Sequence, residues 1–185
     1  ALGYLLIKYG VSVSVTLSPG FNPEFFDLPG GGSVLTLPPL AFDFSHGAHR
    51  ITQNFMWGRT LDVCDRMINL LKQDEFEDTG ESLYDRALFY GATDFGRTKA
   101  RSAPVNFGTG HDLNNGAFMV CAKGKAGLYG GVNVDSAETH GFNLTTGAED
   151  TGRQTSEREL FAGVLQLLGV DTVDAGLPDV SALRP

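Results

Sequence analysis

The chain has 185 residues, of which 42% are hydrophobic and 19% are charged, enough to bury one core. We expect residues 1–185 to form a single domain. The 14 lysines and arginines against 22 aspartates and glutamates give a net charge of -8, and no basic stretch carries interleaved aromatic residues, which excludes a nucleic-acid-binding surface. No apolar run approaches the roughly 20 residues that cross a bilayer, so no transmembrane segment is expected.

The first 41 residues predict a helix, a strand and a long loop. Residues 1–10 have the pattern of the last turns of a helix that ends at Gly10, which favours a missing upstream part. Residues 11–17 alternate valine with serine and threonine, as is typical of a strand. Residues 18–41 contain prolines and glycines that interrupt regular structure, so they predict a loop insertion with a short hairpin at residues 33–37.

The middle of the chain predicts a helix followed by strands. A helical pattern begins near residue 51, and the apolar runs 87–92 and 116–122 are typical of buried strands. Residues 132–134 predict a further strand. The apolar face of the helix is predicted from residues that recur every three or four positions, namely Leu61, Cys64, Ile68 and Leu71.

The last predicted helix has the clearest sequence signals. Ser156 and Glu159 form a capping box at its start, and Gly169 ends it. Residues 170–185 predict an extended, loosely structured tail. Strands that alternate with helices predict an α/β fold, in which a mainly parallel or mixed sheet has helices on both faces. Polar sites in such sheets gather at the carboxyl ends of strands.

Histidines and aspartates gather in the loops near those expected strand ends. His46 and His49 follow Asp43, Asp94 follows the first apolar run, and His111 precedes the second. Carboxylate oxygens and imidazole nitrogens are ligands that zinc selects, and a bound metal ion can activate water or polarise a phosphoryl oxygen. These residues therefore suggest metal-assisted hydrolysis. The alternative is that the aspartates cap turns and the histidines form hydrogen bonds within loops.

Other polar residues carry weaker signals. Arg97 could bind an anionic substrate through its planar guanidinium, and the alternative is a structural ion pair with Asp94. His140 has no acidic neighbour in the sequence, so we expect a loop residue without a special role. Cys64 and Cys121 lie far apart and predict small core residues.

The order of the polar motifs resembles domain-of-unknown-function family 1501, a bacterial family allied to alkaline phosphatases, sulfatases and phosphomutases. The most specific match is Asp-Phe-Gly-Arg-Thr at residues 94–98, where the family has an acidic residue followed by Phe-Gly-Arg. Phe-Asp-Phe-Ser-His at residues 42–46 and Gly-His at residues 110–111 support it. The resemblance covers nearly all of this chain but only the C-terminal half of a usual member. It implies an alkaline phosphatase-like fold that is incomplete in this chain.

The resemblance also implies roles for individual residues. Asp43 and His46, with His111, would hold one divalent metal ion such as zinc, and Asp94 would serve a second metal ion. His49 could replace His46, and this alternative stays open. Phe95 departs from the superfamily pattern, because active members have a metal-binding histidine at that position.

Two functions follow from the resemblance. The first is a metal-dependent phosphate or sulfate ester hydrolase that acts on a small anionic ester. The nucleophile of the superfamily lies in its N-terminal half, so the catalytic residue is unassigned and activity would need that missing segment or a partner chain. The alternative is a non-catalytic structural or assembly subunit built on a hydrolase-like scaffold. Relatives that are exported imply a periplasmic or exported location.

Overall fold

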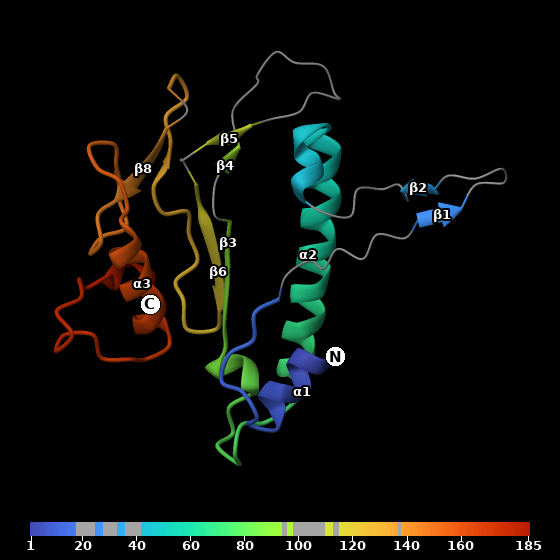
Figure 1. Cartoon of the computed structure of the whole chain (residues 1–185). Coiled ribbons are helices and arrows are strands. Elements are labelled where there is room, and N and C mark those ends of the chain that lie inside the picture. The colour runs from blue at the N-terminus through green and yellow to red at the C-terminus, as the bar shows by residue number, and fades with distance from the viewer. Residues whose placement is uncertain are drawn as a thin grey trace. The chain divides into compact units, whose positions relative to one another are not determined.

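The computed structural model describes residues 1–17, 25–27, 33–35, 42–93, 96–97, 110–112, 115–136 and 138–185 (Figure 1). These residues divide into two compact units. Unit 1 comprises Ala1–Leu70 and Arg97–His111, and unit 2 comprises Leu71–Gly96 and Asp112–Pro185. None of the described helices is both long enough and apolar enough to span a membrane.

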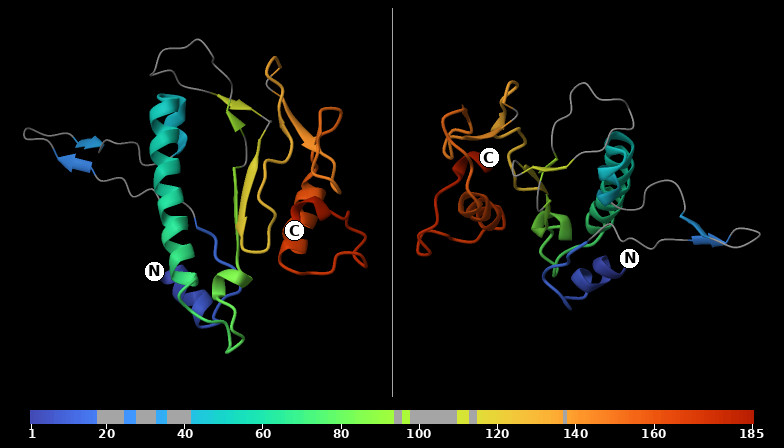
Figure 2. Two further views of the ribbon diagram at one scale, coloured as in Figure 1. Left: turned by 180° about the vertical axis from the view of Figure 1, so that it is seen from behind. Right: turned by 45° about the horizontal axis from the view of Figure 1, so that its top comes forward.

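Unit 1 contains the two N-terminal helices. Helix α1 spans Leu2–Lys8, and Gly10, which follows it, has a φ of 64°, as expected of a glycine that ends a helix. Figures 1 and 2 show α1 beside the C-terminal part of helix α2, which spans His49–Leu71. The approach is close, because a Cβ atom on Gly3 would lie 3.9 Å from Met67 Cε.

The buried face of α2 differs from the predicted face. Of the four residues expected to form it, only Leu71 is fully buried, and Leu61 is 51% exposed. The buried side chains are instead Thr52, Met56, Met67 and Leu71. Their separations of 4 and 11 residues correspond to about one and three helical turns, so they share one stripe of the helix. The predicted helix is confirmed, and its predicted orientation is wrong in part.

The N-terminal strand prediction is wrong. Residues 11–17 form no strand, and the Val13 side chain is fully exposed. A β-branched run forms a strand only where a second strand pairs with its backbone groups. Within the predicted loop insertion, a short antiparallel hairpin joins β1 (Phe25–Asp27) to β2 (Ser33–Leu35), and the other residues of 18–41 lie outside the described residues. The short helix η1 (Phe42–His46) then leads to α2.

Unit 2 begins with the two predicted apolar strands. Strand β3 (Leu88–Ala92) and strand β6 (Ala117–Cys121) confirm the predicted strands, but they pair antiparallel with each other. Gly91 faces Phe118 in this pair, and a Cβ atom on Gly91 would lie 2.1 Å from the Phe118 ring. The aromatic ring therefore requires glycine at that position.

The remaining strands form two further small sheets. Strand β4 (Gly96–Arg97) lies beside β5 (His111–Asp112) in a two-stranded sheet. The other sheet has the order β7-β8-β9, with antiparallel pairing throughout. Its strands are β7 (Gly131–Val132), β8 (Thr139–Phe142) and β9 (Glu149–Asp150).

The predicted α/β fold, with a mainly parallel or mixed sheet and an alkaline phosphatase-like arrangement, is wrong. Among the described residues, each sheet has two or three strands, and no parallel sheet has helices on both faces. A short apolar run predicts a buried strand, but it does not specify the direction of the partner strand. The expectation that polar loops gather at the carboxyl ends of strands assumed a parallel sheet, so it does not hold for this fold.

The core of unit 2 lies between α3 (Glu157–Leu167) and the C-terminal segment. The predicted capping box of Ser156 and Glu159 is present at the start of α3. Phe142, Ala162, Val180 and Ala182 form the buried cluster. The last two residues belong to the segment that was predicted to be a loose tail, which instead contains the short helix η3 (Ser181–Leu183). The Val180 and Ala182 side chains fill the core beside Ala162 of α3. The remaining short helix, η2, spans Leu83–Arg86.

Candidate functional site

Three of the predicted site residues meet in unit 1. His46 is the last residue of η1, Arg97 lies in β4 and His111 lies in β5. The Nε2 atoms of His46 and His111 are 3.2 Å apart, and the centroids of the two rings are 5.0 Å apart. Arg97 Nη1 lies 3.2 Å from the same His46 Nε2 atom. We call these three residues the His46 cluster.

The contacts of η1 with α2 position His46. Ser45 is fully buried, and its Oγ atom accepts a hydrogen bond of 2.9 Å from Gln53 Nε2. Gln53 Oε1 in turn accepts a hydrogen bond of 2.9 Å from Trp57 Nε1, and the Trp57 ring packs edge-on against Phe42. These contacts join the start of α2 to both ends of η1. The orientation of His46 is therefore tied to α2.

The Arg97 guanidinium determines which atoms of the His46 cluster donate hydrogen bonds and which accept them. A guanidinium only donates hydrogen bonds, so the Nε2 atom of His46 accepts in its contact with Arg97. His111 Nε2 contacts the same atom, so it donates. This pattern places the His46 proton on Nδ1 and directs both donors at the lone pair of Nε2. Arg97 Nη2 also donates to the Phe42 carbonyl over 3.4 Å, which holds the guanidinium beside η1.

His49, the alternative to His46, is the first residue of α2. The contact with His111 described above is made by His46. Burial lowers the pKa of His49, and the positive charges of Arg97 and Arg50 lower it further. His49 is thus an additional imidazole close to Arg97, and its neutral form is favoured.

The two predicted carboxylate ligands are not placed. The backbone of Asp43 lies in η1, but its side chain is outside the described residues, as are Asp94 and Phe95. In the described part of the chain, no group of three or more His, Cys, Asp or Glu side chains is arranged to hold a metal ion. Of the four predicted metal ligands, the structure therefore places two side chains, the imidazoles of His46 and His111.

The spacing of the two imidazoles fits a shared metal ion. Two nitrogen ligands of one tetrahedral zinc ion, at bond lengths of about 2.0–2.1 Å, lie about 3.3 Å apart. The His46 and His111 Nε2 atoms are 3.2 Å apart. The same spacing also allows the direct hydrogen bond described above. Binding a metal ion would then require His111 to move its proton from Nε2 to Nδ1.

His140 makes a contact that its position in the sequence does not predict. This residue lies in β8, and its Nε2 atom pairs with the carboxylate of Glu149. The two residues are nine positions apart, and the reversal of the chain between β8 and β9 brings them together. Only the hairpin pairing could have revealed this contact, because no acidic residue is adjacent to His140 in the sequence.

In comparisons with known proteins, no family model, no curated protein and no solved structure matches this chain. The resemblance to family 1501 therefore remains a prediction from the motifs of the sequence.

Proposed function

We propose that this chain binds a divalent metal ion through His46 and His111 and a phosphate or sulfate ester through Arg97, as part of metal-dependent ester hydrolysis. The observation that supports the proposal best is the 3.2 Å separation of the two Nε2 atoms, which suits two ligands of one zinc ion. When bound, the metal ion would polarise the ester oxygen or activate water. Asp43 and Asp94 are the proposed additional ligands.

Arg97 favours an anionic substrate at this site. Its Nη1 atom lies 3.2 Å from His46 Nε2, so a cation at the two imidazoles would also lie close to the guanidinium. An oxyanion between the two positive charges would compensate for their repulsion. The planar fork of arginine matches two oxygens of a phosphate or sulfate group. The His46 cluster thus combines a metal-binding pair with a partner for the substrate.

The metal-binding part of the proposal is tested by zinc titration of the chelator-treated full chain with isothermal titration calorimetry. We expect one zinc ion per chain, and at least about tenfold weaker binding in His46→Ala and in His111→Ala, because each change removes one of two imidazole ligands. His49→Ala decides between the two candidate histidines and should keep full affinity. His140→Gln is the control, since His140 belongs to unit 2. Absence of zinc binding, or binding unchanged in both alanine variants, would contradict the proposal.

The substrate part of the proposal is tested by phosphate binding and by hydrolysis of p-nitrophenyl phosphate. In Arg97→Gln we expect phosphate binding to the zinc-loaded chain to weaken at least about tenfold while zinc affinity is kept. Arg97→Lys keeps the charge without the fork and should show an intermediate loss. Equal phosphate affinity in all three proteins would rule out Arg97 as the anion-binding residue. The hydrolysis assay reports whether the chain acts alone or needs a nucleophile from another segment or partner.

A second candidate function is that of a non-catalytic assembly subunit. It is favoured by two apolar side chains of α2 that lie seven residues apart, and hence on one face of the helix, and that stay partly exposed, Val63 at 51% and Leu70 at 37%. Sedimentation of the full chain tests it. We expect self-association that the double variant Val63→Ser, Leu70→Ser abolishes. A folded monomer that hydrolyses an aryl phosphate would contradict this candidate.

A further inference from the structure

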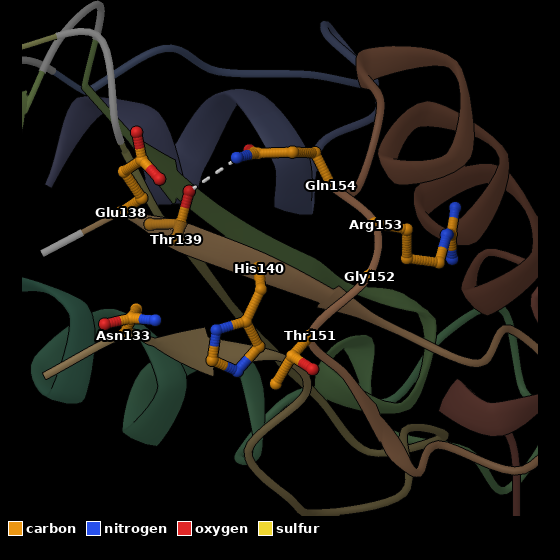
Figure 3. A pocket seen from close by; sticks show the side chains of 8 residues that line it. All are labelled: Asn133, Glu138, Thr139, His140, Thr151, Gly152, Arg153 and Gln154. Atoms are coloured by element: carbon orange, nitrogen blue, oxygen red, sulfur yellow. Dashed lines mark hydrogen bonds between the residues drawn. The ribbon is translucent and has the colours of Figure 1, made fainter. Parts of the chain in front are cut away.

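A small polar cleft lies in unit 2, apart in the sequence from the His46 cluster. It has a volume of about 280 Å³ and is formed by β8, the residues that precede it and the segment after β9 (Figure 3). Its lining consists mainly of side chains that form hydrogen bonds, namely Asn133, Glu138, Thr139, His140, Thr151 and Gln154. Among the residues that the structure describes there, none is a large apolar one. The cleft is therefore suited to a ligand rich in polar groups.

His140 is the most constrained side chain of the cleft. Only 9% of the side chain is exposed, and Nε2 is paired with the Glu149 carboxylate. In the neutral imidazole, Nε2 then carries the proton and Nδ1 accepts hydrogen bonds. Figure 3 shows the imidazole ring between Asn133 and Thr151, which also line the cleft. His140 thus offers an oriented acceptor to a ligand in the cleft.

Gly131 makes room for this arrangement. It pairs with His140 across β7 and β8, and a Cβ atom on Gly131 would lie 2.7 Å from His140 Nε2 and 3.0 Å from Glu149 Oε1. Any larger residue would displace the imidazole or the carboxylate. The backbone of β7 therefore fits closely around the His140–Glu149 pair.

The lining excludes several classes of ligand. An anion would meet the Glu138 carboxylate, and the Arg153 guanidinium already binds the Phe142 carbonyl and the Glu159 carboxylate. Figure 3 shows the Arg153 side chain directed away from His140. A metal ion lacks a set of three His, Cys, Asp or Glu ligands in the part of the chain that the structure describes. An apolar ligand would remove the Glu138 carboxylate and the Thr151 hydroxyl from water without offering them a hydrogen bond in return.

We propose that this cleft binds a monosaccharide. Each sugar hydroxyl both donates and accepts hydrogen bonds, so a sugar matches a lining that mixes amides, hydroxyls, a carboxylate and an imidazole. His140 Nδ1 accepts from one sugar hydroxyl, Glu138 accepts from another, and the Gln154 amide serves as donor and acceptor. The volume of the cleft lies just below the range of pockets for drug-sized ligands and so suits a single small sugar. This site is independent of the proposed ester-binding site.

Saturation-transfer NMR on the full chain tests the proposal, with glucose, galactose, mannose and N-acetylglucosamine as separate probes. We expect saturable binding of at least one sugar and at least about tenfold weaker binding in His140→Gln, because the oriented acceptor is lost. Glycerol, which has too few hydroxyls to span the cleft, should not compete at equal concentration. Failure of all four sugars to bind would overturn the proposal.

A surface variant keeps the test decisive if His140→Gln unfolds. Gln154 is exposed, and its described hydrogen bond is the one it accepts from Thr139 over 3.4 Å, so Gln154→Ala should fold normally. We expect it to weaken sugar binding about threefold to tenfold. Gln73→Ala is the matched control, because Gln73 is an exposed residue away from the cleft. Equal sugar affinity in Gln154→Ala and Gln73→Ala would place the sugar elsewhere.

Discussion

At the residue scale, Glu159 shows how opposing effects fix the charge of one side chain. Partial burial raises its pKa, but hydrogen bonds from the Ser156 backbone and hydroxyl and from Arg153 outweigh the burial, so the pKa is lowered overall. The carboxylate closes the capping box of α3 and pairs with Arg153. Its charged form is therefore part of the folded structure of unit 2.

The lowered pKa predicts a pH-dependent effect of Glu159→Gln. Since the folded pKa lies below the unfolded value near 4.3, the stabilisation is present above pH 4.3 and is lost as the pH falls through the folded pKa. Glutamine keeps the shape but not the charge, so we expect a loss of about 1 kcal/mol at pH 7 and almost none at pH 3. Urea unfolding at both pH values measures this difference.

Glu157→Gln is the control for this prediction. Glu157 lies in the same first turn of α3 but is not part of the capping box. It shares the helix-dipole effect without the hydrogen bonds, so its loss should be smaller at pH 7. Equal losses in the two variants would show that the dipole alone is responsible.

At the scale of elements, two glycines within helices have opposite roles. Gly58 lies in the interior of α2, and a Cβ atom there would meet nothing within 4 Å. Gly163 lies in α3, and a Cβ atom there would lie 2.7 Å from Leu183 Cδ1. The first glycine only weakens its helix, whereas the second allows η3 to pack against α3.

The same substitution at these two glycines should change stability in opposite directions. We expect Gly58→Ala to stabilise the protein by about 0.5–1 kcal/mol, because alanine lowers the backbone entropy of the unfolded chain. Gly163→Ala should destabilise it by about 1–3 kcal/mol through overpacking. Thermal unfolding followed by circular dichroism checks both. A stabilising effect of Gly163→Ala would mean that the Leu183 side chain moves aside without loss of packing energy.

At the scale of the whole molecule, the C-terminal segment completes the core of unit 2. Val180 is 1% exposed and packs in one cluster with Phe142 and Ala162, whereas Val173, seven residues earlier, is 77% exposed. Gln166 on α3 holds this segment through hydrogen bonds to Thr172 Oγ1, the Pro178 carbonyl and the Val180 amide. The end of the chain is therefore a structural part of the unit.

Two valine substitutions separate the buried part of this segment from its exposed part. We expect Val180→Ala to lower the free energy of unfolding by about 2 kcal/mol, because it removes buried methyl groups and leaves a cavity. Val173→Ala removes the same atoms from an exposed site and should change stability by less than about 0.5 kcal/mol. Chemical denaturation of both variants measures the difference. Similar values for the two would exclude Val180 from the core.

Several local elements can be predicted from neighbouring residues alone. The capping box at Ser156, the glycines that end α1 and follow α3, and the apolar runs of β3 and β6 all act within a few residues, so their signals are contained in the sequence. It also brought His46, Arg97 and His111 forward as candidates, and the structure places these three in contact.

Which elements pair, and which side chains they bury, depends on tertiary contacts. The antiparallel pairing of β3 with β6, the buried stripe of α2 through Met56 and Met67, and the burial of Val180 depend on partners distant in the sequence. The His140–Glu149 contact likewise exists only because β8 and β9 pair. Periodicity shows that a segment has an apolar face, but packing selects the partner of that face, and no local pattern encodes this choice.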